Sequence, residues 1–367
     1  MLNVVVKNTE RFLLSVPKTK RKKYGQFFTN MSTAKFMASL FCFDRSKPCL
    51  EILDAGAGTG ILATAVIQKL IDDGYKGRIH VTCYETDDFV MPVLEENMRL
   101  STVLPNVTCS IKTDNYITSQ NFSNYTLFGG EDFHYDYIIG NPPYLKTSKD
   151  AIEALAMPEV CYGAPNLYFL FWAMGIHNLK EGQELVYIIP RSWTSGAYFK
   201  RFREYLFREC VLTDIHLFEK RDKVKKTRVV PSAINITTSS TSDFKDISFF
   251  SAPYETVVTK NHCVCVVTNS DDVNVLHTIN HFSKTLPEIN LKMQTGIIVD
   301  FRTREVLRNE LEEGAYPLLY AQHIREGKIV WPLGKEGEVI KTERKSYLQE
   351  NGNFLLVKRF TSKEEPR

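Results

Sequence analysis

Short apolar runs rich in valine and isoleucine alternate with longer helix-like segments between about residue 50 and residue 240. Strands that are buried on both faces read as such runs, and the segments between them are long enough to form covering helices. The alternation predicts an α/β fold of the Rossmann-like type, in which helices cover both faces of a mostly parallel sheet of seven strands. The candidate strands are residues 51–54, 80–84, 106–112, 135–139, 185–189, 213–218 and 233–237.

Two of the intervening segments have the apolar spacing of helices that pack on a sheet. They are residues 61–71 (ILATAVIQKLI) and residues 198–208 (YFKRFREYLFR). Beyond residue 238 the alternation gives way to polar turns, a strand-like stretch at 263–268 and a helix at 271–282. We therefore predict an N-terminal segment (1–45), a large α/β domain (46–245), a connecting region (246–284) and part of a second domain (285–367).

No apolar run approaches the roughly 20 residues that cross a bilayer, and the amino terminus lacks the apolar middle of a signal peptide. A cytoplasmic protein without membrane partners is therefore expected. The eight cysteines are scattered, which favours buried reduced thiols over a disulfide framework. His277 and His281 lie four residues apart, but they have no third ligand in the sequence nearby, so we predict no metal site.

The formal net charge of +3 does not distinguish a nucleic-acid-binding protein from a metabolic enzyme. The distribution of the charge is more informative, because residues 18–23 and residues 220–228 are two dense basic runs. Such runs are usually solvated loops, but they also suit contacts to phosphate. The charge pattern alone leaves both interpretations open.

A glycine-rich turn follows the first candidate strand in the segment LEILDAGAGTGIL (50–62). Turns of this kind bring bare backbone close to a nucleotide-like ligand, although NAD and phosphate sites use them as well. The next strand ends in Glu85, where a carboxylate can accept hydrogen bonds from both hydroxyls of a ribose. The alternative is that Glu85 is only a solvent-exposed acid at the end of a strand and binds no ligand. The candidate ligand contacts in the turn are Asp54, Ala55, Gly56 and Gly58.

The most specific motif is Asn141-Pro142-Pro143-Tyr144, directly after the strand at 135–139. The Asn141 side-chain oxygen and the Pro142 carbonyl can each accept one hydrogen of an amino group, and the two prolines restrict the backbone that presents them. Tyr144 offers a flat face on which a base can stack. A simple Pro-Pro turn with a capping asparagine is the alternative.

Together these motifs resemble the DNA amino-methyltransferases that carry a DPPY- or NPPY-type motif, with the target-recognition domain last. The chain is similar in particular to adenine-specific modification enzymes of type II restriction–modification systems and to type I modification subunits. The resemblance runs from Tyr24 to the carboxyl terminus. It implies S-adenosylmethionine as cofactor, with Phe27 and Thr29 of YGQFFT at its methionine end and Asp114 at its adenine.

The same resemblance implies double-stranded DNA as partner and transfer of methyl to the exocyclic nitrogen of a flipped-out adenine. Residues 285–367 then resemble the start of the recognition domain. The candidate DNA contacts are Lys22, Lys23, Arg221, Lys225, Lys226, Arg302 and Arg304.

Two positions depart from the family pattern. Relatives place a second stacking aromatic in the loop after residue 218, where this chain has Val224 and Lys225, so Phe218 or a cation is expected to replace it. The chain also ends inside a segment that is internal in relatives, so a C-terminal continuation or a partner subunit is expected to complete target recognition.

Alternative functions remain at this point. The NPPY motif also occurs in enzymes that methylate RNA bases or the glutamine of release factors, and a catalytically weak modification or specificity component is a further possibility. Nuclease activity is not expected, because only some 20 residues precede the first cofactor motif.

Overall fold

The computed structural model describes residues 1–15, 29–122, 134–217, 231–235, 255–258, 263–267 and 270–357. It divides into two compact units, Met1–Ile279 and Asn280–Arg367. The division lies close to the boundary near residue 285 that the sequence predicts. Phe27, Lys22 and Lys23 lie outside the described residues, as do Arg221, Lys225, Lys226, Phe218 and Val224.

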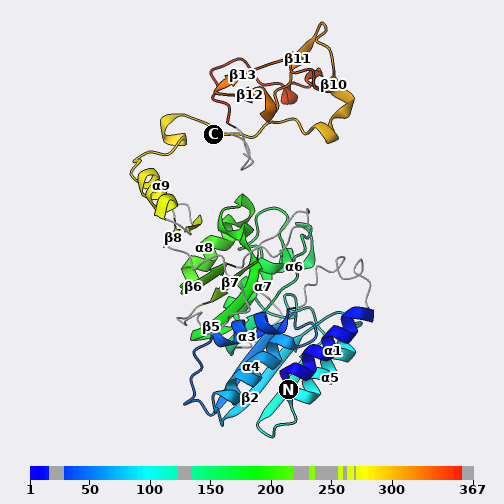
Figure 1. The fold of residues 1–367 in the computed structure, drawn as a ribbon, viewed down its shortest axis with the longest axis vertical. Coiled ribbons are helices and arrows are strands. Elements are labelled where there is room, and N and C mark those ends of the chain that lie inside the picture. The colour runs from blue at the N-terminus through cyan, green and yellow to red at the C-terminus, as the bar shows by residue number, and fades with distance from the viewer. Residues whose placement is uncertain are drawn as a thin grey trace. The chain divides into compact units, whose positions relative to one another are not determined.

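A single sheet organises the first unit (Figure 1). Within the described residues its strand order is β3-β2-β1-β4-β5-β7-β6. The strands from β3 to β5 run parallel, whereas β7 is antiparallel to both of its neighbours. The predicted α/β fold is thereby confirmed. The strand bounds are β1 (Cys49–Ala55), β2 (Arg78–Tyr84), β3 (Val107–Lys112), β4 (Tyr135–Gly140), β5 (Leu179–Pro190), β6 (Asp214–Leu217) and β7 (Pro231–Asn235).

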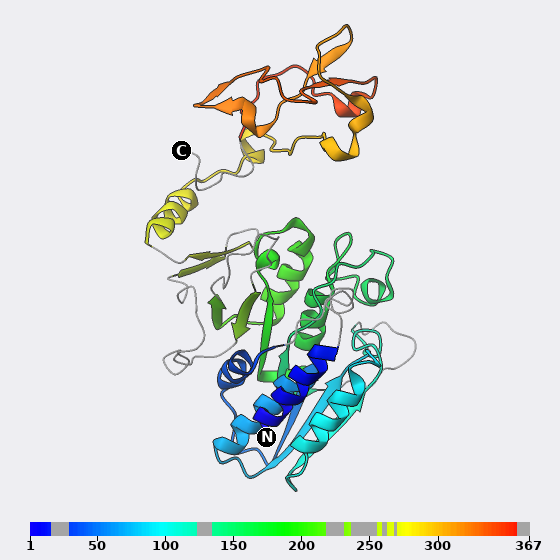
Figure 2. The same ribbon diagram turned by 45° about the vertical axis from the view of Figure 1, so that its right-hand side comes forward.

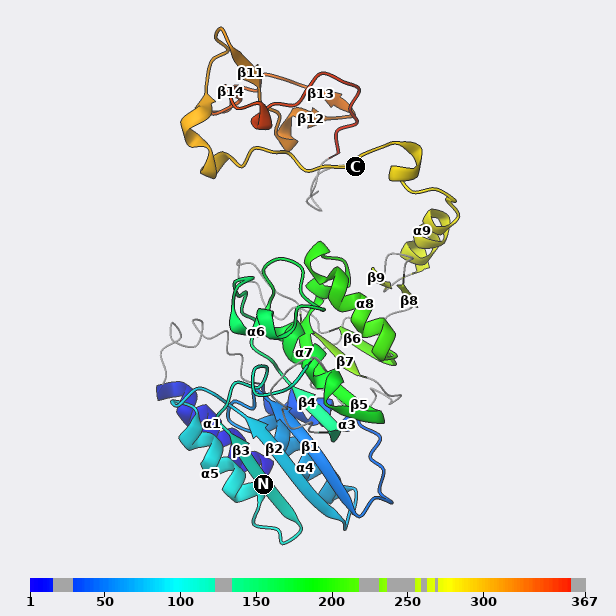
Figure 3. The ribbon, with the colours of Figure 1, turned by 180° about the vertical axis from the view of Figure 1, so that it is seen from behind.

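Helices cover both faces of this sheet. Side chains alternate between the faces along each strand, so Ile52 of β1 joins one hydrophobic cluster while its neighbour Leu53 joins the other. The first cluster packs against α1 (Leu2–Ser15), α3 (Met31–Ser39), α4 (Ile61–Asp72) and α5 (Met91–Ser101). The second packs against α6 (Ile152–Ala156), α7 (Leu167–His177) and α8 (Lys200–Glu209), with η1 (Arg191–Thr194) and η2 (Ala197–Phe199) between β5 and α8. Figure 1 views the sheet from the side of α1, α4 and α5, and Figure 3 from the other side.

Helices α1 and α7 were not predicted from the sequence. Helix α7 (LYFLFWAMGIH) buries eight of its residues and is apolar on almost every side, so it has no amphipathic period to distinguish it from a buried strand. Its start is nevertheless marked, because the Asn166 side chain accepts a hydrogen bond from the backbone N–H of Tyr168. Helix α1 buries Leu2, Val5 and Thr9 and packs beside α4 and α5, and Figure 2 shows these helices side by side.

The first unit ends with a hairpin of β8 (Glu255–Val258) and β9 (Val264–Val267), followed by α9 (Ser270–Asn280). The helix predicted at 271–282 therefore starts one residue earlier and ends two residues earlier than expected. Among the described residues no helix has the length and apolar character needed to span a membrane.

The second unit is built from short strands and turns. Strands β10 (Leu307–Arg308), β14 (Val339–Lys341) and β11 (Ala315–Pro317) form an antiparallel sheet, and β12 (Ile324–Arg325) pairs with β13 (Lys328–Ile329). Inside this unit the buried His323 and Glu338 side chains approach to 3.2 Å. The remaining elements are the 3-10 helices η4 (Pro287–Ile289), η5 (Asp300–Arg302), η6 (Arg304–Val306), η7 (Ala321–His323) and η8 (Lys345–Tyr347).

Candidate active site

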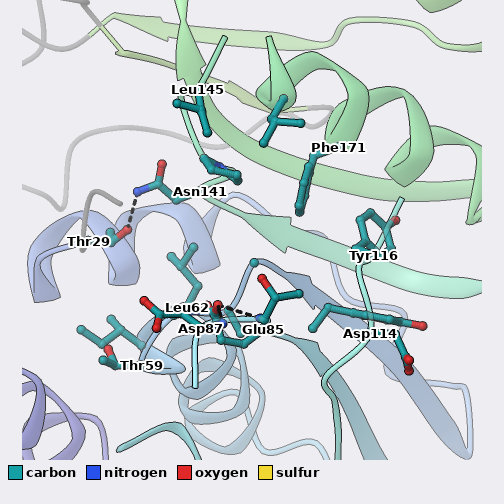
Figure 4. Close-up of a pocket in the computed structure, with 18 residues that line it drawn as sticks. Thr29, Thr59, Leu62, Glu85, Asp87, Asp114, Tyr116, Asn141, Leu145 and Phe171 are labelled. Atoms are coloured by element: carbon teal, nitrogen blue, oxygen red, sulfur yellow. Dashed lines mark hydrogen bonds between the residues drawn. The ribbon is translucent and has the colours of Figure 1, made fainter. Parts of the chain in front are cut away.

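A cavity opens at the carboxyl ends of β1, β2 and β4, which is where ligands bind in open α/β sheets. Figure 4 shows Asn141 and Thr29 at one end of it and Asp114 and Tyr116 at the other. The residues that line it are Thr29, Gly56, Ala57, Gly58, Thr59, Ile61, Leu62, Tyr84, Glu85, Thr86, Asp87, Asp114, Tyr116, Asn141, Pro143, Leu145, Leu167 and Phe171.

The glycine-rich turn forms one wall of the cavity with its backbone. Gly56, Gly58 and Gly60 all have positive φ, a region that other residues enter only with strain. At Gly60, where φ is +77°, an added Cβ would also come within 2.5 Å of the Met98 side chain. The sequence therefore needs glycine here to turn the chain sharply from β1 into α4.

Glu85 directly follows β2 and lies beside the glycine-rich turn, where its side chain contacts Gly58. One carboxylate oxygen accepts the Gly58 N–H at 2.9 Å, and the other accepts the N–H groups of Thr86 and Asp87 at 2.8 and 2.9 Å. Burial raises the pKa of Glu85, and these three backbone hydrogen bonds act in the opposite direction. The carboxylate therefore fixes the shape of the turn as well as facing the cavity.

Asp54 and Ala55 are fully buried and do not line the cavity, in contrast to the direct contacts expected from the sequence. The Asp54 carboxylate accepts the backbone N–H of Ala63 at 3.0 Å, which satisfies one of the unpaired donors in the first turn of α4. Burial raises the pKa of Asp54 to about 7. This residue supports the turn from beneath, because it is the side chain of a central strand that points into the sheet–helix interface.

Helix α1 covers the glycine-rich turn from outside, a contact that no sequence pattern predicts. Thr9 donates its hydroxyl hydrogen to the Thr59 hydroxyl at 2.8 Å. The Asn97 side chain accepts a hydrogen bond from Asn8 at 3.0 Å and donates one to the Thr59 carbonyl at 2.8 Å. Residues near the amino terminus thus hold the ligand-facing loop in place.

The Asn141–Tyr144 motif reaches the cavity through Asn141 and Pro143, whereas Pro142 is buried and Tyr144 does not line the cavity. The Asn141 side-chain nitrogen donates to the Thr29 hydroxyl at 3.2 Å, the contact drawn in Figure 4. The Tyr144 ring packs edge-to-face on Tyr168, with ring centroids 6.1 Å apart. Tyr144 thus packs against the second hydrophobic cluster, and the contact of its ring with a base stays a prediction.

Most of the predicted cofactor-binding residues that the structure describes lie at the cavity, together with others that were not predicted. Thr29, Gly56, Gly58, Glu85 and Asp114 line one cavity, as the sequence predicts for a shared ligand. The lining residues that sequence reasoning missed include Leu62, Asp87, Tyr116 and Phe171. Phe171 was missed because it lies on α7, a helix that the sequence does not predict. Asp87 and Tyr116 each lie two residues after a predicted contact, Glu85 and Asp114 respectively.

Replacing Gly56 by valine is expected to weaken cofactor binding by at least about tenfold, equivalent to about 1.4 kcal/mol. Gly56 has φ +72°, and an added Cβ lies 3.5 Å from Phe171 and 3.8 Å from Pro143, two residues that line the cavity, so a larger side chain would take up space there. Gly74→Val is the matched control, because Gly74 has φ +78° with open space around it. Calorimetric titration should show weaker binding in the first variant only; equal affinity in both would place the ligand elsewhere.

Arg302 and Arg304 are exposed in the second unit, on η5 and η6. The Arg302 guanidinium lies 5.4 Å from the Phe301 ring centroid. In the part of the chain that the structure describes, no three histidine, cysteine or acidic side chains gather as a metal site.

Residues 50–224 match the family described as Eco57I restriction-modification methylase. The chain is 30% identical over 369 residues to the type II methyltransferase M.BsuBI of Bacillus subtilis, and the alignment covers 95% of this chain and 73% of that protein. It is also 30% identical over 393 residues to the type II methyltransferase M.PstI of Providencia stuartii, with coverage of 100% and 77%.

Among solved structures, the type I restriction-modification methyltransferase subunit of Streptococcus thermophilus superposes with a TM-score of 0.44 at 16% identity. That superposition covers 71% of this chain and 54% of the subunit.

S-adenosylmethionine is the cofactor of this class of methyltransferase, as predicted. The residues present fit it, since Glu85 presents a carboxylate to the cavity and Gly56 leaves room that a side chain would take. With 30% identity to M.BsuBI along nearly its whole length, the chain belongs to the restriction–modification methyltransferases of the Eco57I family.

Proposed function

We propose that this protein methylates the exocyclic amino nitrogen of adenine in double-stranded DNA, as the modification activity of a restriction–modification system. The observation that carries the proposal is the position of Asn141, whose amide lies on the wall of the same cavity as Glu85 and the glycine-rich turn. One cavity thus holds both the Asn141 side chain, which can accept a hydrogen bond from the target amine, and the residues that would bind the cofactor. The amine and the methyl donor could therefore meet there.

S-adenosylmethionine supplies an electrophilic methyl group when it is bound. Glu85 would accept hydrogen bonds from its ribose, Asp114 would receive its adenine, and Thr29 with Gly56 and Gly58 would enclose the rest. The lining of the cavity and the family pattern support these assignments.

Asn141, which lines the cavity, and the backbone carbonyl of Pro142, assigned from the family pattern, would hold the target amine. The lone pair of the adenine amine is delocalised into the ring, so the amine is a poor nucleophile until its two hydrogens are held and the lone pair can turn toward the methyl donor. The Asn141 oxygen and the Pro142 carbonyl each accept one hydrogen, and the restricted φ of the prolines keeps these acceptors in place. No strong general base would be needed, because the amine becomes acidic as the new bond forms and its proton can pass to water.

The base must leave the duplex to reach this site, at a cost of a few kcal/mol. Contacts to phosphate and base edges would compensate for that cost, and we assign them to the second unit as part of a target-recognition domain. A C-terminal continuation or a partner subunit would supply the remaining contacts that recognise the DNA sequence.

One observation favours a second candidate. The release factor glutamine methyltransferase of Fusobacterium nucleatum is 33% identical over 137 residues, but this match covers only 37% of the chain. Protein glutamine is therefore the substrate to test beside DNA and RNA.

The test is incubation of the chain with S-adenosylmethionine labelled in its methyl group and with unmethylated genomic DNA, total RNA or a release factor. Digestion of the DNA to nucleosides should yield labelled N6-methyladenine. Label in methylated cytosine would change the assigned base, and label confined to RNA or protein would exclude the DNA assignment.

Removing Arg302 and Arg304 together by substitution with alanine should weaken DNA binding and reduce its dependence on salt. Log affinity falls linearly with log salt, and each lost phosphate contact makes this fall less steep by about 1. The control with the same loss of charge is Lys76→Ala with Arg78→Ala, because both are exposed at the amino-terminal end of β2, away from the cavity. Fluorescence anisotropy over a salt series measures both variants; identical slopes would remove Arg302 and Arg304 from the interface.

A further inference from the structure

The side-chain amide of Asn141 is bonded on both of its sides. Its nitrogen donates to the Thr29 hydroxyl at 3.2 Å, and its oxygen accepts from the Tyr144 hydroxyl at 2.8 Å. The two orientations of an asparagine amide have almost the same shape and exchange a donor for an acceptor. Neighbouring groups therefore decide which atom is presented to the cavity.

The Tyr144 hydroxyl has a second acceptor, the backbone carbonyl of Ile188, also at 2.8 Å. A hydroxyl has one hydrogen, so it donates to one of these oxygens at a time. Because the amide oxygen has two lone pairs, it can accept from Tyr144 and still accept from an incoming amine. When the hydroxyl turns to Ile188 instead, it no longer donates to the Asn141 oxygen.

We propose that the hydroxyl groups of Tyr144 and Thr29 are positioning groups, which keep the oxygen of the Asn141 amide available to the target amine. The inference rests on the proposed function of Asn141. It gives Tyr144 a role that is separate from stacking on a base, and gives Thr29 a role that is separate from enclosing the cofactor.

The surroundings suit such a role. Burial raises the pKa of Tyr144 well above its usual value, so the hydroxyl keeps its hydrogen at neutral pH. The ring is fixed by its edge-to-face contact with Tyr168, and Thr29 lies directly before Asn30, the N-cap residue of α3. Both hydroxyls are thus carried by anchored parts of the fold.

The test uses Thr29→Val and Tyr144→Phe, which keep the shape of each side chain and remove its hydroxyl. Each change is expected to lower the single-turnover rate of methyl transfer by about three- to tenfold, the worth of one neutral hydrogen bond. The rate is measured with unmethylated genomic DNA at saturating S-adenosylmethionine, and cofactor affinity is measured separately by calorimetry.

The double variant shows whether the two hydroxyls act on the same group. Effects of independent residues multiply, whereas residues that share a partner deviate from the product. We expect a deviation of at least about threefold, because both hydroxyls are bonded to the same amide. Thr29→Ser keeps the oxygen and should recover most of the rate lost in Thr29→Val.

A second readout does not depend on turnover. The side-chain amide signal of Asn141 in a ¹⁵N correlation spectrum, assigned by its loss in Asn141→Ala, should exchange its hydrogens with water faster in Thr29→Val, because the acceptor for one of them is gone. This measurement reports on the amide even if the chain alone transfers no methyl group.

The outcomes separate this inference from the proposed function. Label found in cytosine instead of adenine would overturn the assigned base, while the ratio of variant to wild-type rates would still measure the positioning of the amine. Rates within twofold of wild type in both single variants and in the double variant would overturn the positioning role. So would a Thr29→Val variant with weaker cofactor binding but an unchanged saturated rate and unchanged amide exchange.

Discussion

An Asn141→Ala variant should transfer methyl groups roughly a hundred- to a thousandfold more slowly than the wild-type chain while it binds S-adenosylmethionine with nearly the same affinity. The Asn141 oxygen is the acceptor proposed for one hydrogen of the target amine, so its contribution is made when the amine reacts. Its nitrogen contacts Thr29, whereas the glycine-rich turn is held by Glu85. Loss of the amide therefore leaves the cofactor side of the cavity intact.

Asn141→Asp is the matched control for this prediction, since aspartate keeps an acceptor oxygen and occurs at this position in the DPPY form of the motif. Thr29 can donate its hydroxyl hydrogen to a carboxylate, so the side chain remains held. The methyl-transfer rate of Asn141→Asp is expected to lie between those of the wild type and Asn141→Ala. Retention of more than about a tenth of the wild-type rate by Asn141→Ala would remove Asn141 from the role assigned to it.

The sequence was sufficient for the parts of the site that are made by backbone. A glycine-rich turn requires positive φ at fixed positions, and the strand before it and the helix after it are visible as apolar patterns. The predicted positions of Gly56, Gly58 and Glu85 at one cavity follow from this, because the carboxyl ends of parallel strands meet at one edge of a sheet.

The sequence was insufficient where side chains from distant segments decide the geometry. Asp54 occupies a motif position that suggests ligand contact, yet it faces α4, because the direction of a side chain at the end of a strand depends on the alternation of faces. The Tyr144 hydroxyl is bonded to the carbonyl of Ile188, which lies on a neighbouring strand. Neither arrangement has a local signal, since each depends on a partner brought close by the tertiary fold.

Glu85→Ala should weaken the binding of S-adenosylmethionine by about ten- to a hundredfold, because a hydrogen bond to a charged group is worth about 1.5–3 kcal/mol. The carboxylate also accepts the N–H groups of Gly58, Thr86 and Asp87, so the alanine variant loses the cofactor contact and the group that shapes the turn.

Glu85→Gln separates these two contributions, since its remaining oxygen can still accept from Thr86 and Asp87 while its new NH₂ group faces the Gly58 N–H without being able to accept from it. Calorimetry should therefore place the affinity of Glu85→Gln between those of the wild type and Glu85→Ala. At saturating cofactor, both variants should transfer methyl groups at rates close to the wild-type rate, because Asn141 and its partners are unchanged. This is the reverse of the pattern expected for Asn141→Ala, in which the rate falls and the affinity is kept. An unchanged affinity in Glu85→Ala would mean that the cofactor ribose is held by another residue of the cavity, for which the neighbouring Asp87 is the first to replace.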